Sequence, residues 1–370
     1  MKFLVVTHAP TLAKDERFYS YAPYVKEMDI WLGHVDTVTI TSPTLYDKPL
    51  LEQAFKRTDI EVVSLPAIDF VTLGNSFHAL LNLPVIFFRL WLEMKKTDHI
   101  HLRCPGTIAL VGCIVQIFFP KKSKTAKYAG NWDPKSRQPL SYRIQKWILS
   151  NTILTKNMKV LVYGEWPGSS RNIKSFFTAS YPEGKRRGVV ERNFSQPFSF
   201  MFAGSLSDGK QPLYALKLVE CLNAEGIGCR LSIYGDGAVA SELEQYIADR
   251  SIQQYIKMYG NRPSEEVEAA YKQTDFLILA SRSEGWPKVV AESMFWGCIP
   301  IVTPVSCVPW MLGEGKRGIL ISGNVETDLA LVKSHLENTS ELERMSVAGQ
   351  KWAQQYTLDS FEKEIIKLLR

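Results

Sequence analysis

Hydrophobic and polar positions along the chain form short apolar runs that are separated by longer amphipathic stretches. In the first half, the runs that read as buried strands are KFLVVTH, VDTVTITS, IEVVSLP, HIHLRCPG, AKYAGNW and KVLVYG. Helical periodicity lies between several of them, for example over Phe77–Lys96 and Ser141–Leu154. Strands that alternate with helices in this way predict an α/β fold with parallel sheets.

A polar and charged segment, Tyr181–Pro197, interrupts this pattern, and the alternation restarts after it. The strands predicted for the second half are FSFMFAGSL, CRLSIYGDG, IKMYG, DFLILAS and CIPIVT, each of the first four followed by a helical stretch. The final segment, YTLDSFEKEIIKLLR, is an amphipathic helix with apolar positions at Leu358, Phe361, Ile365, Ile366 and Leu369. We expect one domain over 1–192, a second over 193–355, and a terminal helix over 356–370.

The length of 370 residues suits two domains better than a single core. The six cysteines are scattered and show no metal-ligand spacing, which indicates buried free thiols in a reducing compartment. The longest apolar run, Thr107–Phe119, is shorter than the ~20 residues that a membrane-spanning helix needs, so it predicts a buried helix. The start reads as a first strand and not as a signal peptide. These features predict a cytoplasmic protein.

Charge divides the chain into unlike halves. Residues 1–192 carry 27 Lys and Arg against 16 Asp and Glu, whereas residues 193–370 carry 17 against 22. The basic excess includes the segment FFPKKSKTAK and the pair Lys95–Lys96, which follow aromatic and apolar residues. This combination predicts a peripheral position on an anionic inner membrane face, although a solvated basic rim fits equally well. The excess is modest and no nucleic-acid-binding motif is present, so we expect no nucleic-acid partner.

The segment SRSEGWPKVVAESMFWGC places two carboxylates, Glu284 and Glu292, around a predicted strand end and the helix behind it. Ligands of open parallel sheets bind at the carboxyl ends of the strands. Pro287 suits the first helical position, and the helix start offers amide groups and a positive dipole end to a phosphate. A ligand could therefore place phosphate at the helix start, with hydroxyl groups on each carboxylate. The spacing alone also fits a capping Glu284 and a solvated Glu292.

Several motifs together resemble the retaining glycosyltransferases of family 4, which have the GT-B fold. SRSEGWPKVVAESMFWGCIPIVT is similar to their Glu-x7-Glu signature, and FMFAGSLSDGK is similar to their phosphate loop. LSIYGDG, IKMYGNRPSEEVEAAY and VSCVPWMLGEGKRGILI follow in the family's order. The resemblance covers residues 195–325 well and implies two Rossmann-like, doubly wound domains that face a central cleft, with the terminal helix crossing back to the first domain.

The resemblance also assigns roles to residues of the second half. It implies that Lys210 binds the donor diphosphate, that Glu284 contacts the transferred sugar, and that Glu292 binds the ribose. Lys210 and Glu284 are the expected catalytic residues. The expected donor-binding set is Gly204, Ser205, Lys210, Gly235, Arg262, Arg282, Glu284, Gly285, Trp286, Pro287 and Glu292. Ser205 departs from the family, which usually has an arginine there, and Arg282 or Arg262 is the expected substitute.

In GT-B enzymes the first domain mainly receives the acceptor. His8, His101, Arg103 and Asn131 lie at predicted strand ends and are the candidate acceptor-binding residues. Arg103 suits an acceptor phosphate or carboxylate, whereas His101 alternates with Ile100 and also suits a position under a helix layer. No metal or other cofactor is expected, because the resemblance implies that basic side chains and helix dipoles neutralise the leaving diphosphate.

The expected function is a retaining, metal-independent transfer of a sugar from a nucleotide-sugar to a hydroxyl of a glycan or lipid-linked acceptor in cell-surface polysaccharide biosynthesis. Two alternatives stay open from the sequence. A nucleotide-sugar 2-epimerase would need converging carboxylates and histidines, and the second half holds only His335. A non-catalytic nucleotide-sugar binding protein would account for Ser205 in place of arginine.

Overall fold

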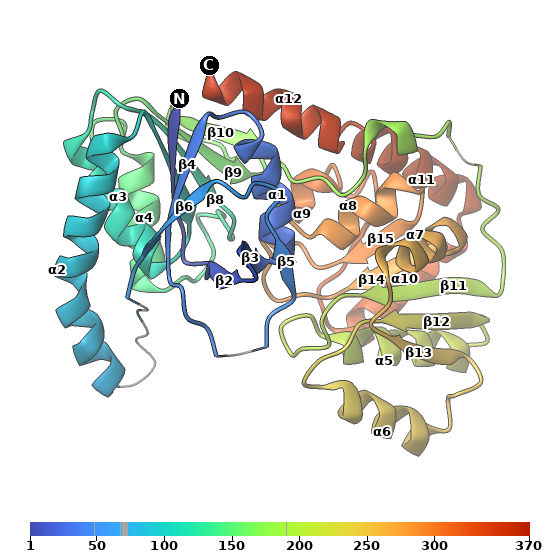
Figure 1. The fold of residues 1–370 in the computed structure, drawn as a ribbon. Helices are drawn as coiled ribbons and strands as arrows, with labels where there is room; N and C mark the ends of the chain where they lie inside the picture. The colour runs from blue at the N-terminus through green and yellow to red at the C-terminus, as the bar shows by residue number, and fades with distance from the viewer. Residues whose placement is uncertain (48, 67, 69–72, 190) are drawn as a thin grey trace. The chain divides into compact units, whose positions relative to one another are not determined.

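The computed structural model describes residues 1–47, 49–66, 68, 73–189 and 191–370. The chain folds into two compact units. Unit 1 comprises Met1–Phe177 together with Phe361–Arg370, and unit 2 comprises Thr178–Ser360. Each unit is built on a parallel sheet with helices on its faces, as the alternation of strands and helices predicts (Figure 1).

Unit 1 contains a seven-stranded parallel sheet of order β10-β9-β8-β7-β1-β4-β6. Its strands are β1 (Lys2–Val6), β4 (Thr37–Ser42), β6 (Ile60–Ser64), β7 (His99–Cys104), β8 (Ser123–Tyr128), β9 (Met158–Tyr163) and β10 (Ile173–Phe176). β1 lies in the interior of the sheet between β7 and β4, and four of its five residues are buried, as expected of a strand covered on both faces.

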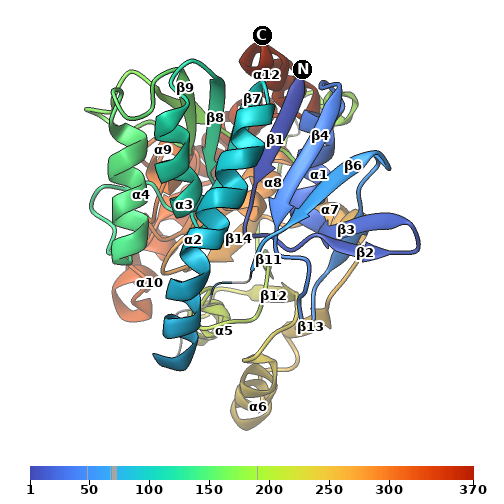
Figure 2. The ribbon, with the colours of Figure 1, turned by 60° about the vertical axis from the view of Figure 1, so that its left-hand side comes forward.

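Helices of unit 1 cover the two faces of this sheet. They are α1 (Ala22–Leu32), α2 (Leu73–Lys96), α3 (Thr107–Val115) and α4 (Leu140–Ser150), with a short 3-10 turn, η1 (Gln116–Phe118), after α3. α2, α3 and α4 lie on one face, where Leu4 and Val6 of β1 and Ile100 and Leu102 of β7 join one apolar core (Figure 2). The predicted buried helix over the run Thr107–Phe119 is thus α3 and η1. Among the described residues, no helix has the length and apolar character to cross a membrane.

A small antiparallel sheet lies beside α1 and was not predicted. It consists of β2 (Leu12–Lys14), β3 (Arg17–Tyr21) and β5 (Glu52–Ala54). These strands are short and half-exposed, and β3 pairs with β5 across more than thirty residues of chain. Such segments lack the long apolar run by which the sheet strands of this chain can be found.

The C-terminal helix α12 (Leu358–Leu369) has its residues from Phe361 onward in unit 1. Phe361 and Ile365, two of its predicted apolar positions, are buried. The Phe361 ring contacts the rings of Phe176 and Phe177. Glu362 Oε1 lies 2.7 Å from His34 Nε2, within hydrogen-bonding distance. The end of the chain therefore packs on the unit that contains its beginning.

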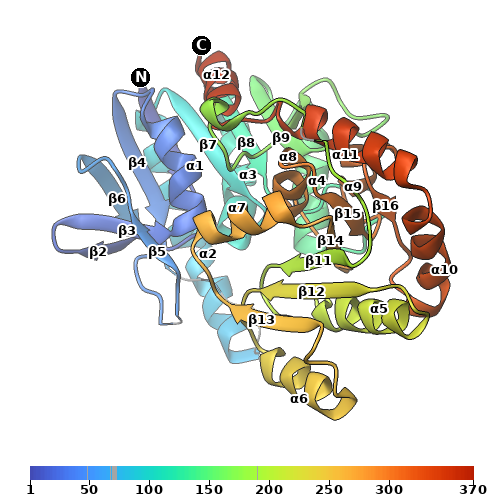
Figure 3. The same ribbon diagram turned by 90° about the vertical axis from the view of Figure 1, so that its right-hand side faces the viewer.

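Unit 2 contains a second parallel sheet of six strands in the order β13-β12-β11-β14-β15-β16 (Figure 3). The strands are β11 (Phe198–Ala203), β12 (Cys229–Tyr234), β13 (Ile256–Gly260), β14 (Phe276–Leu279), β15 (Ile299–Val302) and β16 (Ile319–Leu320). The helices are α5 (Pro212–Ala224), α6 (Ala240–Arg250), α7 (Ser264–Gln273), α8 (Lys288–Phe295), α9 (Val308–Met311), α10 (Val325–Leu336) and α11 (Thr339–Ala353), with a 3-10 turn η2 (Glu183–Lys185).

The segment 178–192 lies in unit 2, so the units divide fifteen residues before the predicted boundary at 193. Three side chains in it bind to the body of unit 2. Ser180 donates to Glu292, Lys185 pairs with Glu268, and the Arg192 guanidinium donates to the carbonyl groups of residues 271, 274 and 296. The polar composition of this segment therefore reflects attachment to a domain and not an exposed linker.

Polar side chains occupy the second face of the unit 1 sheet, under α1. Residues of β7 alternate, so His99, His101 and Arg103 share this face. Both histidines contact the Thr125 hydroxyl, at 2.9 Å from His99 Nε2 and 2.8 Å from His101 Nδ1. Burial lowers the pKa of His99 to about 4 and places that of His101 well below its usual value, so both rings are neutral in the folded protein.

These histidines predict that unit 1 loses stability in mild acid. Between pH 6.5 and about 4 the unfolded chain binds a proton at His99 that the folded chain does not, so the free energy of unfolding falls as the pH falls. For His99 the loss at pH 5 is about 2 kcal/mol. Urea unfolding followed by circular dichroism at pH 7 and pH 5 measures it. His99→Gln should reduce this pH dependence, and an unchanged slope in that variant would contradict the assignment.

Candidate active site

The loop that carries Glu284 leaves the carboxyl end of β14 and is fixed at both of its ends. The Thr303 hydroxyl donates to the carbonyl oxygen of Ser281 at 2.5 Å. Ser306 and Cys307 donate to the carbonyl oxygen of Gly285, at 3.1 and 3.2 Å. The segment VSCVPW therefore holds this loop through the Ser306 hydroxyl and the Cys307 thiol.

Lys210 and Glu284 lie together although 74 residues separate them in the sequence. Lys210 Nζ donates to Glu284 Oε1 at 2.5 Å, and the amide of Arg282 donates to the carbonyl oxygen of Gly209 at 2.9 Å. The two contacts join the loop after β11 to the loop after β14. The side chain of Glu284 is 9% exposed and that of Lys210 is 27% exposed, so this ion pair is held close to the protein body.

The start of α8 lies directly after this pair. The helix begins at Lys288 with Pro287 as its cap residue, one position later than predicted, and no side chain caps it. Its first turn carries no acidic residue. Amide groups at such a helix start bind anions, because they have no carbonyl partner within the helix. Lys210 and the α8 start together therefore form a site that suits a diphosphate.

Glu292, one turn further along α8, is hydrogen-bonded and not a freely solvated residue. The Ser180 hydroxyl donates to Glu292 Oε1 at 2.5 Å, and the Tyr271 hydroxyl donates to Oε2 at 3.4 Å. Tyr271 is fully buried, and burial together with the Glu292 charge raises its pKa well above the usual value. It therefore stays a donor at neutral pH. Neither partner carried a sequence signal, since Ser180 lies 112 residues from Glu292.

Two glycines make the phosphate loop possible. Gly204 and Gly235 follow the neighbouring strands β11 and β12, and both have positive φ values, 142° and 135°. A Cβ atom at Gly235 would lie 1.8 Å from the carbonyl oxygen of Gly204, which is closer than any real contact. The close approach of the two loops therefore requires glycine at 235, whereas at Gly204 only the backbone conformation favours glycine, because a Cβ atom there meets nothing within 4 Å.

Gly235→Ala is expected to displace the Gly204 loop and to lower the melting temperature of unit 2. The new methyl group meets a backbone carbonyl, and the positive φ adds strain, a combination that costs roughly 1–3 kcal/mol. Gly209→Ala is the matched control on the neighbouring loop after β11, because a Cβ atom there meets nothing within 4 Å. Thermal unfolding followed by circular dichroism compares them, and equal melting temperatures would contradict the close approach.

The arginines expected to replace the family's usual cation lie in other surroundings. Arg262 donates to the carbonyl oxygen of Tyr259 at 3.0 Å and lies 3.9 Å from Glu266. Arg282 lines a polar cavity of about 460 Å³ together with Gln211 and other residues of α5, α6 and α10. Ser205 is exposed on the loop that ends in Lys210. The structure thus brings Lys210 to Glu284 but shows no contact of either arginine with that pair.

Trp286 forms part of a buried aromatic cluster in unit 2. Its ring lies 6.2 Å from the rings of Trp310 and Trp352 and 5.7 Å from that of Tyr356. It is 7% exposed. Its contacts indicate that it anchors the loop between Glu284 and Pro287 in the domain core, and donor contact by its side chain remains a prediction.

The four candidate acceptor residues of unit 1 fall into two groups. His8, which is exposed, and Asn131 follow β1 and β8 at the carboxyl edge of the sheet, and a Cβ atom at Gly106 would lie 3.3 Å from the Cβ of His8. The Asn131 side-chain oxygen accepts from the amide of Asp133 at 2.9 Å. Both residues are placed at the edge where ligands of parallel sheets bind.

The other two candidates are covered by α1, which corrects their interpretation as acceptor ligands. His101 is fully buried, and its ring lies 4.5 Å from that of Trp31. Arg103 pairs with Glu27 of α1, and its guanidinium lies 5.4 Å from the Tyr24 ring. The sequence shows the alternation of β7 but not which helix covers its polar face. These two residues serve the interior of unit 1.

Groups that could bind a metal or support epimerase chemistry are not gathered near Glu284. Among the residues that the structure describes, no cluster of three or more His, Cys, Asp or Glu side chains is arranged to hold a metal ion. His335 lies on α10 and faces Glu341 at 3.3 Å. Metal independence itself stays a prediction.

Comparison with known proteins agrees with the site geometry. Residues 189–352 match the family "Glycosyl transferases group 1". The putative colanic acid biosynthesis glycosyltransferase WcaL of Salmonella typhimurium is 27% identical over 187 residues, which cover 47% of this chain and 45% of the relative. GDP-mannose:cellobiosyl-diphosphopolyprenol alpha-mannosyltransferase of Xanthomonas oryzae is 27% identical over 82 residues, 22% of each chain. The chain therefore aligns with less than half the length of these relatives.

Solved structures give the fold of the whole chain. The crystal structure of Anabaena HepE in complex with UDP and glucose superimposes with a TM-score of 0.67 at 16% identity, covering 100% of this chain and 99% of that one. Sucrose-phosphate synthase from Thermosynechococcus elongatus gives 0.65 at 14% identity, covering 100% and 98%. The fold of the chain is GT-B, and its segment 189–352 is similar to the group 1 glycosyl transferases.

Proposed function

We propose that this protein is a retaining glycosyltransferase that moves a sugar from a nucleotide-sugar to a hydroxyl group of a glycan or lipid-linked acceptor in polysaccharide biosynthesis. The observation that carries the proposal is the 2.5 Å contact between Lys210 and Glu284 beside the uncapped start of α8. The names of the relatives support it, since they include transferases of colanic acid biosynthesis and a diphosphopolyprenol mannosyltransferase.

The residues of unit 2 divide the chemistry between them. Lys210 and the α8 amide groups would take the charge of the diphosphate, which grows as the bond from the anomeric carbon to the phosphate oxygen breaks. Glu284 would accept hydrogen bonds from sugar hydroxyls and Glu292 from the ribose. The acceptor oxygen forms its bond on the same face, and its proton passes to the departing diphosphate. No protein general base and no metal ion are required by this route.

A peripheral position on an anionic membrane face belongs to the same proposal. Lys95, Lys96 and Lys121 are exposed near the C-terminal end of α2 and after η1. Lys122 Nζ donates to the carbonyl oxygen of Lys95 at 2.9 Å, which keeps these cations together. Exposed aromatic residues stand nearby, for example Phe118. Basic and aromatic residues in one region suit the headgroup layer of an anionic bilayer.

A ligand screen followed by product analysis tests the function. Nucleoside diphosphates and their sugars are added while thermal unfolding is followed, and one diphosphate should stabilise the protein by about 2.7 kcal/mol at a hundred times its Kd. Proton NMR of the product should then show the anomeric configuration of the donor. An inverted product would refute retention. A stabilising nucleotide-sugar that is neither transferred nor hydrolysed would instead indicate a non-catalytic binding protein, and no shift with any nucleotide would refute the donor site.

A further inference from the structure

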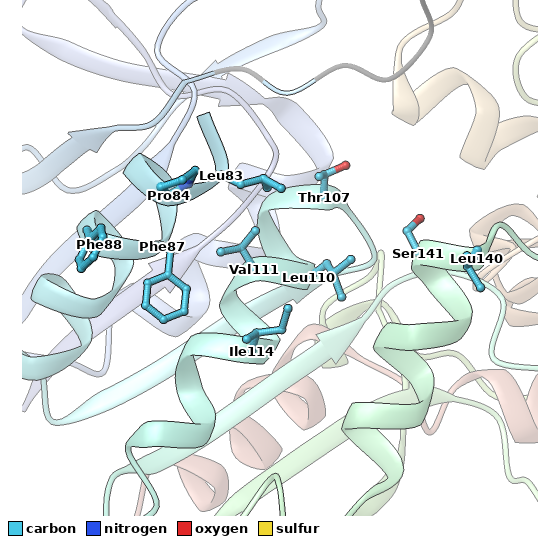
Figure 4. A pocket seen from close by; sticks show the side chains of 10 residues that line it. All are labelled: Leu83, Pro84, Phe87, Phe88, Thr107, Leu110, Val111, Ile114, Leu140 and Ser141. Atoms are coloured by element: carbon cyan, nitrogen blue, oxygen red, sulfur yellow. The ribbon is translucent and has the colours of Figure 1, made fainter. Parts of the chain in front are cut away.

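An apolar groove of about 870 Å³ lies on unit 1, on the outer side of the helices that cover the sheet. Its lining comes from three helices, with Leu83 and Phe87 on α2, Leu110 and Ile114 on α3, and Leu140 at the start of α4 (Figure 4). Eight of its ten lining residues are apolar. The donor site on unit 2 uses none of them, so the groove has no role in the chemistry described so far.

The surroundings of the groove are apolar as well. Of the sixteen large hydrophobic side chains that are exposed among the described residues, ten lie on α2, α3, η1, α4 and the turn that follows α4. Phe88 and Trp147 are 65% and 63% exposed. Exposed apolar side chains gathered on neighbouring helices in this way indicate an interaction site. Because these exposed hydrophobic side chains lie mainly on three neighbouring helices, we expect an apolar molecule to bind there.

Charge indicates what kind of occupant it is. From Thr107 to Asn157 the chain carries nine Lys and Arg residues, five of which are exposed, and a single acidic residue, Asp133. Arg143 is exposed on α4 itself, one turn from both Leu140 and Trp147, whereas Lys146 Nζ donates to the carbonyl oxygens of Trp132 and Asp133. An apolar groove with a basic border is complementary to a molecule that joins a hydrocarbon chain to an anionic head. With Asp133 as its one acidic residue, this stretch of sequence offers little to pair with a basic protein partner.

The groove opens at the edge of the sheet where the acceptor is expected. Thr107 and Ser141 line one end of it, at the first residues of α3 and α4. The amide of Gly106, next to Thr107, donates to Gln145 of α4 at 3.2 Å, which holds the two helix starts together. Gly106 also lies against His8. A molecule whose polar head lies beside His8 can therefore extend its chain directly between α2, α3 and α4.

We infer that this groove binds the hydrocarbon chain of a polyprenyl-phosphate-linked acceptor, with the phosphate and sugar at the carboxyl edge of the unit 1 sheet. The inference rests on the proposed function and narrows it, because it selects the lipid-linked acceptor over a free glycan. The hydrocarbon chain anchors the acceptor in the groove, and His8 and Asn131 lie at the sheet edge where its phosphate and sugar would bind. Bulk membrane lipid in the groove is the competing source of the same hydrocarbon chemistry.

Photo-crosslinking tests the groove without requiring turnover. The probe is a polyprenyl monophosphate with a benzophenone at the end of its chain, offered in neutral detergent micelles, and the labelled peptides are identified by mass spectrometry. We expect labels on α2, α3 or α4 that unlabelled polyprenyl phosphate competes away. Labels elsewhere, or none, would overturn the inference. Equal competition by phosphatidylglycerol would also overturn it, because the groove would then hold bulk lipid.

Two variants and one control separate the groove from the surface around it. Leu110→Trp and Ile114→Trp fill the groove and should lower labelling about tenfold, a loss equivalent to about 1.4 kcal/mol. Ile114 is already 40% exposed, so its variant should fold even if the Leu110 variant does not. Trp147→Ser removes an exposed aromatic residue outside the groove and should keep full labelling. Equal losses in Ile114→Trp and Trp147→Ser would indicate non-specific partition into the micelle and overturn the inference.

The donor side distinguishes failure of this inference from failure of the proposed function. Thermal stabilisation by a nucleoside diphosphate depends on unit 2 and should be unchanged in Ile114→Trp. Stabilisation without groove labelling would refute only the lipid-chain site. Groove labelling in a protein that no nucleotide stabilises would instead refute the glycosyltransferase proposal while the lipid site stands.

Discussion

Glu284→Gln is expected to lower kcat by about 10²–10³-fold with the donor that the ligand screen identifies. The amide keeps the shape of the side chain but loses the charge that Lys210 contacts at 2.5 Å and that sugar hydroxyls would meet in the transition state. Stability should change little, since the pair is partly exposed on its lysine side. Initial rates of transfer and a melting curve measure the two effects separately.

Glu268→Gln is the matched control for this experiment. Its carboxylate is 10% exposed and contacts two lysines, Lys185 and Lys272, within the same unit, and neither lysine belongs to the predicted donor-binding set. Nucleoside diphosphate binding offers a second readout. Glu284→Gln should still bind the nucleoside diphosphate, because Lys210 becomes more available to phosphate. Lys210→Met should bind the nucleoside diphosphate more weakly. Near-normal turnover of Glu284→Gln would refute the catalytic assignment.

The first five strands of the unit 2 sheet and the helices after four of them were predictable because local pattern and tertiary packing agree there, whereas β16, α9, α10 and α11 were not predicted. The helix predicted over SEEVEAAYKQ is α7, and its first turn carries Glu265 and Glu266 while its last carries Lys272, which complements the helix dipole. β2 and β3 were missed because three to five half-exposed residues give no period. The two strands form a sheet only because β3 also pairs with β5, and no local sequence pattern predicts that distant pairing.

The site was predictable where a motif encodes it and unpredictable where folding alone creates it. The resemblance selected Glu284 and Lys210, and the structure brings them into contact. It gave no indication that Ser180 would hold Glu292, because that contact spans 112 residues and a segment read as the end of the first domain. For His101 the sequence left two interpretations open, an acceptor ligand at a strand end and a residue under a helix layer, and the structure has it buried under α1.

Glu27→Ala is expected to destabilise unit 1 by about 3–5 kcal/mol, the largest loss of stability predicted for this chain. The Glu27 carboxylate is 9% exposed and contacts Arg103 and Lys127, the latter at 2.8 Å. Burial opposes its ionisation, but the two cations outweigh burial and lower its pKa to about 2. Its removal leaves two buried cations without their shared anion.

Burial of Lys127 explains why this loss should be large for the group formed by Glu27, Arg103 and Lys127. Its side chain is 1% exposed, and its Nζ lies 5.0 Å from the Phe361 ring of α12, so water cannot replace Glu27 without opening that packing. Urea unfolding should show the full loss in Glu27→Ala and less than about 1 kcal/mol in Glu52→Ala, whose partner Lys14 is exposed. Adding Lys127→Met to Glu27→Ala should restore part of the stability, since one unpaired charge is then removed. If the double variant is less stable than Glu27→Ala alone, then the cost lies in lost packing and not in buried charge.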